Sequence, residues 1–277
     1  MPSKDTILFT VLAFALSSCA PRNGQIPRTN PAAASEEAEM GQQINAQILS
    51  SFYPYTEPRL VSYVSKIGNA LAEHAERRDL QYHFTILYND KIYAASAPGG
   101  FIYLTTALLY FLENESELAA VLAHEIGELQ YKDPRLSRGR KILDGLTKTG
   151  AAVGPAFGQI GALAVLGLAA VHTIADKSQP SPDEKLEGAD TLGLEYMVKA
   201  GYDPQGMIDV LYKFLNSKQL TPYFFDYYQS RPITEERFQA LQTRFSKLPL
   251  DGKSFSANRE DYQERTQGVR EIYNFKS

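Results

Sequence analysis

The segment AVLAHEIGELQ, at residues 120–130, constrains this chain more than any other. In the zinc-binding pattern His-Glu-x-x-His, two histidines four residues apart share one face of a helix, and the glutamate between them acts as a general base. His124 and Glu125 keep the first half of that pattern, whereas Glu128 stands where the second histidine would be. The segment therefore predicts the scaffold of a metal site in which one ligand has been replaced.

The flanking residues predict where this helix begins and which way it faces. Asn114 can cap its start, and Glu117, three residues later, completes a pattern close to a capping box. Leu118, Val121 and Leu122 then form an apolar face. We expect this helix to pack in the interior of the domain.

Composition limits the classes of protein to consider. The chain has 277 residues, of which 44% are hydrophobic, so it can bury the core of one domain with extensions. Its 28 basic and 32 acidic residues give a net charge of -4, and it has no long basic run. Nucleic acid is therefore not expected as a partner.

The N-terminus has the features of a lipoprotein signal peptide, predicted at residues 1–18. Lys4 precedes an apolar stretch at 7–16, and the letters LSSC ending at Cys19 resemble a bacterial lipobox. Cleavage would leave Cys19 as a lipid-bearing N-terminus that binds the membrane. Because Ala20 rather than aspartate follows, we expect a periplasmic protein anchored to the outer membrane. The alternative is an ordinary signal peptide or an N-terminal membrane helix, but the apolar run is short for a span.

The rest of the chain is organised as a tether, a domain and a tail. Residues 19–35 are rich in Pro, Asn and Ala and predict a tether, residues 36–250 the domain, and residues 251–277 a helical tail. Residues 149–175 carry no charge and could form a transmembrane helix, but Pro155 and several glycines favour a packed helical hairpin. The patterns predict strands at 82–88, 92–96 and 101–104, and helices that begin near 36 and 57 or occupy 184–200, the residues after 203, and 234–245.

A glycine-rich turn separates the second and third predicted strands. Gly99 and Gly100 follow Pro98, and glycine adopts backbone angles that other residues resist. We expect the strand after this turn to be exposed and to pair with an extended peptide. Pro98, Gly99 and Gly100 are therefore the candidate substrate strand.

Four segments resemble one family, the HtpX-like and CAAX prenyl endopeptidase zinc metallopeptidases, and in particular its periplasmic lipoprotein branch. They are SAPGGFIYLTTALL (96–109), ENESELAAVLAHEIGE (113–128), GADTLGLEYMVKAGYDP (188–204) and SRPITEERFQAL (230–241). The resemblance implies a mainly helical α+β fold of the zincin-like, gluzincin type, with a small β-sheet and an active-site helix. It also implies a role in envelope protein quality control, with unfolded or misassembled envelope proteins as partners.

By position, the resemblance also assigns roles to residues. His124 matches the first zinc ligand and Glu125 the general base. Asp190 matches a carboxylate that orients a histidine ligand from outside the metal's own shell.

The chain departs from this family where the metal would bind. Glu128 replaces the second histidine, and the family's third ligand, a glutamate, corresponds to Leu186, or to Lys185 in an alternative alignment. Two further histidines of the family correspond to Asp133 and Arg231. Several positions that line the site have therefore changed together.

Two hypotheses follow for the cofactor. In one, zinc binds to His124, Glu128 and Glu187, although Glu187 points about 100° away from the ligand direction on its helix. In the other no metal binds, and Lys185 neutralises Glu128. Counting ligands favours a degenerate metallopeptidase with weak or lost proteolysis that still binds unfolded clients. The alternatives are an active zinc metalloendopeptidase with a His/Glu/Glu ligand set and a purely structural lipoprotein.

Overall fold

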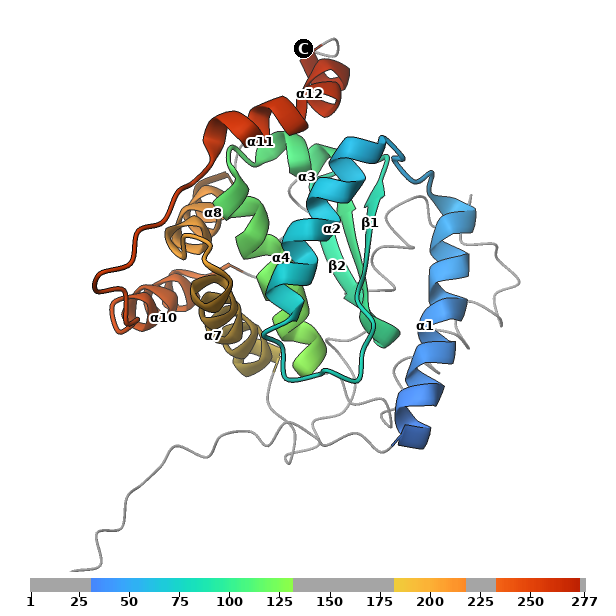
Figure 1. Cartoon of the computed structure of the whole chain (residues 1–277), viewed down its shortest axis with the longest axis horizontal. Coiled ribbons are helices and arrows are strands. Elements are labelled where there is room, and N and C mark those ends of the chain that lie inside the picture. Colours follow the sequence, from blue (N-terminus) through green and yellow to red (C-terminus); the bar gives the residue numbers. More distant parts are fainter. Residues whose placement is uncertain (1–30, 132–181, 218–232, 275–277) are drawn as a thin grey trace, which may run out of the picture.

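The computed structural model describes residues 31–131, 182–217 and 233–274, which form a mainly helical α+β fold around a small sheet (Figure 1). The predicted fold class is confirmed. Cys19, Asp133, Arg231 and the apolar segment 149–175 lie outside these ranges. Within the ranges, no helix combines the length and the apolar character needed to cross a membrane. The helices are α1 (Pro31–Ser51), α2 (Pro58–Ala72), α3 (Thr106–Phe111), α4 (Glu115–Gln130), α7 (Pro182–Ala200), α8 (Gln205–Asn216), α10 (Glu235–Phe245), α11 (Arg259–Arg265) and α12 (Gln267–Asn274).

The three described strands form one mixed sheet. They are β1 (His83–Leu87), β2 (Ala94–Ala97) and β3 (Phe101–Thr105), in the order β1-β3-β2. β3 runs parallel to β1 and antiparallel to β2, and all its residues are buried. The prediction that the strand after the glycine turn is exposed is therefore wrong, because β1 and β2 occupy both of its edges. Each predicted strand is present with slightly shifted ends.

The Pro-Gly-Gly turn is a short 3₁₀ segment, Pro98–Gly100, that packs under α1. Both glycines have positive φ, 79° at Gly99 and 90° at Gly100, as expected from the sequence. α1 approaches closely, since a Cβ on Gly41 would lie 2.2 Å from the carbonyl oxygen of Pro98. α1 begins at Pro31, so residues 31–35 of the predicted tether are helical.

Local capping signals mark the helix ends. The side chain of Asn114 accepts a hydrogen bond from the backbone N–H of Glu117, and that of Thr234 accepts one from Arg237. Gly201 follows α7 with φ of 82°, as expected of a glycine that ends a helix. These predicted boundaries are confirmed.

Helix α4 lies at the centre of the fold. All of its residues are buried except Glu115 and Glu128. α7 packs tightly against it, because a Cβ on Gly127 would lie 2.7 Å from the carbonyl oxygen of Ala189. This close approach sets Asp190, the next residue of α7, beside the motif of α4.

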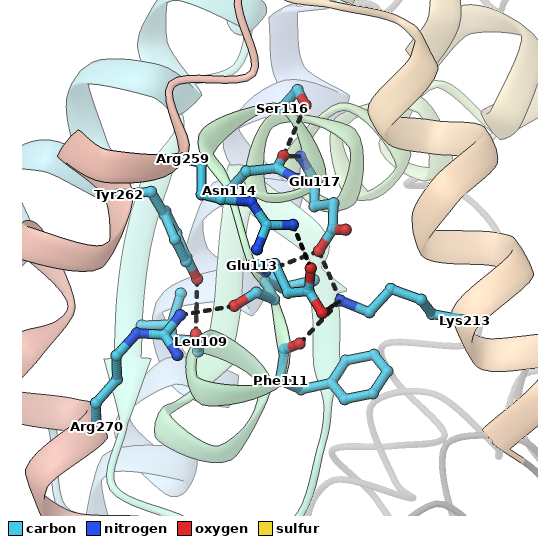
Figure 2. A network of polar contacts seen from close by, with 11 residues as sticks. Leu109, Phe111, Glu113, Asn114, Ser116, Glu117, Lys213, Arg259, Tyr262 and Arg270 are labelled. Carbon is cyan, nitrogen blue, oxygen red and sulfur yellow. Dashed lines mark hydrogen bonds and ion pairs between the residues drawn. The ribbon is translucent and has the colours of Figure 1, made fainter.

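The C-terminal tail, predicted to be helical, forms two short helices, α11 and α12. They pack over α3 and the start of α4, where the Tyr262 hydroxyl donates to the carbonyl of Leu109 at 2.7 Å and Arg270 donates to that of Leu112 at 3.0 Å (Figure 2). On the other side of this junction, Lys213 of α8 binds the carboxylate of Glu117 at 2.9 Å. The tail is therefore part of the folded core.

Candidate functional site

The site centres on His124, whose two ring nitrogens each face a carboxylate. Its Nδ1 lies 2.8 Å from Oδ1 of Asp190 on α7, and its Nε2 lies 3.6 Å from Oε1 of Glu128, one turn along α4. The imidazole is only 6% exposed. The structure thus brings together three of the residues singled out in the sequence.

A buried arginine holds Asp190 from the other side. Arg237, in the first turn of α10, donates from Nε to Oδ2 of Asp190 at 2.8 Å and from Nη2 to Oδ1 at 2.9 Å. Such a two-point contact fixes the plane of the carboxylate as well as its charge. Arg237, Asp190 and His124 therefore form a chain of contacts that runs through three helices.

Sequence reasoning missed Arg237, although a signal was present. Arg237 precedes Phe238 and stands one turn before Leu241, so it shares the inward face of its helix with apolar residues. A charged residue on such a face is rarely buried without a partner. The partner, Asp190, lies on another helix and could not be read from local spacing.

The charges around His124 shift its protonation. Burial by itself would lower the pKa of His124, but the hydrogen bond to Asp190 and the nearby carboxylate of Glu128 outweigh it and raise the pKa to about 9. Burial alone would raise the pKa of Asp190, whereas Arg237 and His124 hold that pKa well below its usual range. Without a metal, the imidazolium flanked by carboxylates is therefore the favoured form at neutral pH.

Two glutamates complete the motif on α4. Glu125, the predicted general base, is fully buried. Glu128 is partly exposed, and its Oε2 accepts a hydrogen bond from Oγ of Ser96 at 3.3 Å. This contact joins β2 to α4 two residues before the Pro-Gly-Gly turn. Glu128, the altered position of the motif, therefore lies in the same region as the candidate substrate strand at Pro98, Gly99 and Gly100.

The position assigned to the third ligand offers no donor. Leu186 is buried there, 8% exposed, and a leucine side chain cannot coordinate zinc. The side chain of Glu187 is 39% exposed, and its Oε2 lies 3.9 Å from Arg244 of α10. The structure therefore does not bring Glu187 to His124 and Glu128, and its role as a ligand stays a prediction, as does the pairing of Glu128 with Lys185.

These residues do not fit a complete zinc site. His124 Nε2 is buried without a hydrogen-bond partner and faces Glu128, so two donors meet, but catalytic zinc sites use three protein ligands. Asp190 cannot be the third, because both its oxygens are bound by His124 and Arg237. Across residues 31–131, 182–217 and 233–274, no three His, Cys, Asp or Glu side chains gather closely enough to hold a metal ion.

Comparison with known proteins identifies the fold. The sequence model of peptidase family M48 matches residues 58–245, which is more than half of the chain. The chain belongs to peptidase family M48. Members of this family are zinc metallopeptidases, so the family predicted from the sequence is confirmed.

Individual relatives share less than a third of their residues with this chain over the matched regions. The chain is 28% identical over 218 residues to the beta-barrel assembly-enhancing protease of Escherichia coli K12, a match that covers 77% of this chain and 44% of that protein. The protein of the same name from Yersinia pestis is 28% identical over 221 residues, with the same coverage. The chain therefore spans less than half the length of these relatives.

Proposed function

We propose that this chain is a periplasmic M48 protein, lipid-anchored to the outer membrane through Cys19, that binds unfolded or misassembled envelope proteins and has weak or no proteolytic activity. Similarity to the beta-barrel assembly-enhancing proteases supports the envelope setting. The observation that carries the loss of proteolysis is the buried Leu186 at the third-ligand position. Glu128, which stands in place of the second histidine ligand, supports the same conclusion.

The remaining charges support a site that is stable without a metal. In a zinc site, the metal balances the negative charge of its carboxylate ligands. Here His124 lies between Asp190 and Glu128, and Arg237 binds Asp190 on its other side. The cationic side chains can therefore balance the carboxylates, as buried charges require.

Client binding is proposed near the Pro-Gly-Gly turn. Pro98, Gly99 and Gly100 follow β2 directly, and Ser96 of β2 contacts Glu128. Because α1 covers the turn itself, the client would align along the outer edge of β2, which no described strand occupies, and would there pass the altered motif. Family scaffolds that have lost their chemistry can keep the surface that holds the polypeptide.

The test measures metal, cleavage and binding on the same sample. The full-length chain, purified in mild detergent, is analysed for zinc per chain and incubated with unfolded casein beside a Glu125→Ala variant. We expect much less than one zinc per chain, and casein that is bound but intact in both proteins. One zinc per chain, with cleavage abolished by Glu125→Ala, would instead show an active zinc peptidase, the outcome expected of the alternative with a His/Glu/Glu ligand set. Casein that is neither bound nor cleaved would contradict both.

A restoring variant tests the ligand argument directly. Glu128→His combined with Leu186→Glu returns histidine and glutamate to the two altered positions, and we expect this variant to bind zinc stoichiometrically. Leu186→Gln serves as the matched control because it is polar without being a carboxylate. If the restored variant bound no more zinc than the control, missing ligands would not be the reason for the loss.

A further inference from the structure

A pocket of about 460 Å³ opens on a different face of the molecule, between α2, the start of α4 and α11. Its volume lies in the range of small-ligand sites. The wall contains Ile67, Tyr63 and Tyr202, and Glu115 marks the end of α4 that reaches it. Glu115 stands nine residues before His124, which is roughly 13 Å along the helix. The pocket is therefore separate from the candidate site.

The acidic groups of this pocket are already engaged. Glu115 accepts hydrogen bonds from the Tyr63 hydroxyl and from the Asn258 amide, both at 2.7 Å, so each of its oxygens has a partner. Asp261 pairs with Arg265 of α11 at 3.3 Å, and the Arg265 guanidinium lies 5.8 Å from the centre of the Tyr63 ring. These contacts fix one wall of the pocket.

Two cations of the pocket have no such partner. Arg59 and Lys66 are exposed on α2, and in the described part of the chain neither side chain forms an ion pair or hydrogen bond, although the backbone N–H and then the charge of Arg59 contribute to lowering the pKa of the nearby Glu57 carboxylate. They stand seven residues apart, so their backbones are separated by roughly 10 Å along one face of the helix. The pocket therefore presents two positive charges, one toward each end, above an aromatic and aliphatic wall.

We propose that this pocket binds a short acidic peptide segment in polyproline II conformation, with carboxylates three residues apart. A polyproline II helix has three residues per turn and rises about 3.1 Å per residue, so such carboxylates share one face roughly 9 Å apart and match the spacing of Arg59 and Lys66. The peptide backbone between them would cross the rings of Tyr63 and Tyr202. A single small anion is too short to contact Arg59 and Lys66 at the same time. The proposal is independent of the function proposed above.

The experiment compares matched peptides by titration calorimetry with the full-length chain in mild detergent. The probe is acetyl-Asp-Ala-Ala-Asp-amide, and the controls are acetyl-Asn-Ala-Ala-Asn-amide and acetyl-Asp-Asp-Ala-Ala-amide. We expect the probe to bind at least about tenfold more tightly than either control. Arg59→Gln and Lys66→Gln should each weaken the probe by roughly tenfold. Lys199→Gln, which removes an exposed lysine of α7, should leave its affinity unchanged.

Several outcomes would overturn the proposal. Equal affinity for the three peptides, full affinity in the Arg59→Gln/Lys66→Gln double variant, or no binding of the probe would each do so. Displacement of the probe by an equal concentration of inorganic phosphate would show a simple anion site instead. Casein binding and zinc content should not change in the double variant, so this test and that of the proposed function can fail separately.

Discussion

His124 has a carboxylate beside each ring nitrogen, at 2.8 Å and 3.6 Å. A histidine that binds zinc must present one unprotonated nitrogen to the metal. In this chain the group facing that nitrogen is the Glu128 carboxylate, at 3.6 Å, and its negative charge favours a proton on the nitrogen instead. The replacement of one histidine by glutamate therefore changes the protonation of the histidine that remains, as well as the number of ligands.

Stability should fall with rising pH because of His124. Its folded pKa of about 9 lies above the ordinary value of 6.5, so its contribution is fully present below pH 6.5 and lost as the pH rises through 9. The groups facing it are Asp190, Glu128 and, through Asp190, Arg237. Urea unfolding after chelator treatment should show a decrease of at most roughly 3 kcal/mol between these pH values. His124→Gln should flatten this part of the profile.

A bound metal would reverse the direction in which stability changes with pH. Zinc competes with protons for the imidazole, so a zinc-stabilised protein gains stability as the pH rises over the same interval. A gain that disappears on adding chelator would show that His124 is a metal ligand in this chain.

Arg237 should stabilise the fold more than an ordinary surface arginine does. Arg237→Gln removes one of the two cations that bind the buried carboxylate of Asp190 and leaves only His124, so we expect a loss of about 3 kcal/mol in the free energy of unfolding, the low end for a broken buried ion pair. Arg244→Gln on the same helix is the matched control, because Arg244 is 44% exposed and lies 3.9 Å from Glu187. Arg244→Gln should lower the free energy of unfolding by less than about 1 kcal/mol. Similar losses in the two variants, measured by chemical denaturation, would contradict the inferred role of Arg237.

At the level of elements, the contact between α4 and α7 decides whether the site can form. Gly127→Ala would put a methyl group 2.7 Å from the backbone oxygen of Ala189, which must move Asp190 away from His124. We expect a loss of about 1–3 kcal/mol, which outweighs the better helix propensity of alanine.

The control for this contact is Gly188→Ala on the facing helix. Its nearest neighbour is the hydroxyl of Tyr131, the far end of a side chain that can rotate aside, so the loss should be under about 1 kcal/mol. Thermal unfolding of both variants measures the difference. If Gly188→Ala proved the more harmful, the close backbone contact would not be what limits the packing.

Helix α1 is held by one buried ion pair. Glu37 binds Arg77 at 2.7 Å and also accepts a hydrogen bond from the backbone N–H of Gly99. Glu37→Ala should cost about 2 kcal/mol or more and raise amide exchange across α1 and the Pro-Gly-Gly turn, because among the described side chains Arg77 then keeps only Asp79 as an ion-pair partner. Glu39→Ala, an exposed position on α1, should change neither quantity. Unchanged exchange in Glu37→Ala would show that α1 is held by its apolar contacts alone.

The sequence predicted those features that depend on neighbours along the chain. The cap at Asn114, the end of a helix at residue 200 and the start of a helix near 234 were predicted because capping side chains and glycine act within one turn. The prediction that the strand after the glycine turn is exposed was wrong, because the sequence does not show that β3 is the central strand of the sheet. The link from Arg237 to Asp190 could not be predicted, because it depends on how helices pack, and the role of Glu187 stays a prediction.

At the scale of the whole molecule, the folded core extends beyond the region that matches the family. That match ends at residue 245, yet Tyr262 and Val269 of the tail are completely buried. The tail also supplies donors for the carbonyls of Leu109 and Leu112, at the junction that leads into α4. The start of the motif helix is therefore shaped in part by residues outside the matched region.

Removing the tail should destabilise the chain far more than its exposed surface suggests. A chain that stops after residue 250 leaves the carbonyls of Leu109 and Leu112 without their tail donors and uncovers the apolar surface beneath Tyr262 and Val269. We expect a strongly lowered unfolding temperature or aggregation during purification. Tyr262→Phe, which removes only the hydroxyl, should cost about 1 kcal/mol, and Glu260→Ala, at an exposed position of α11, almost nothing. If the shortened chain melted at the temperature of the full chain, α11 and α12 would be an appendage, and the matched region would fold by itself.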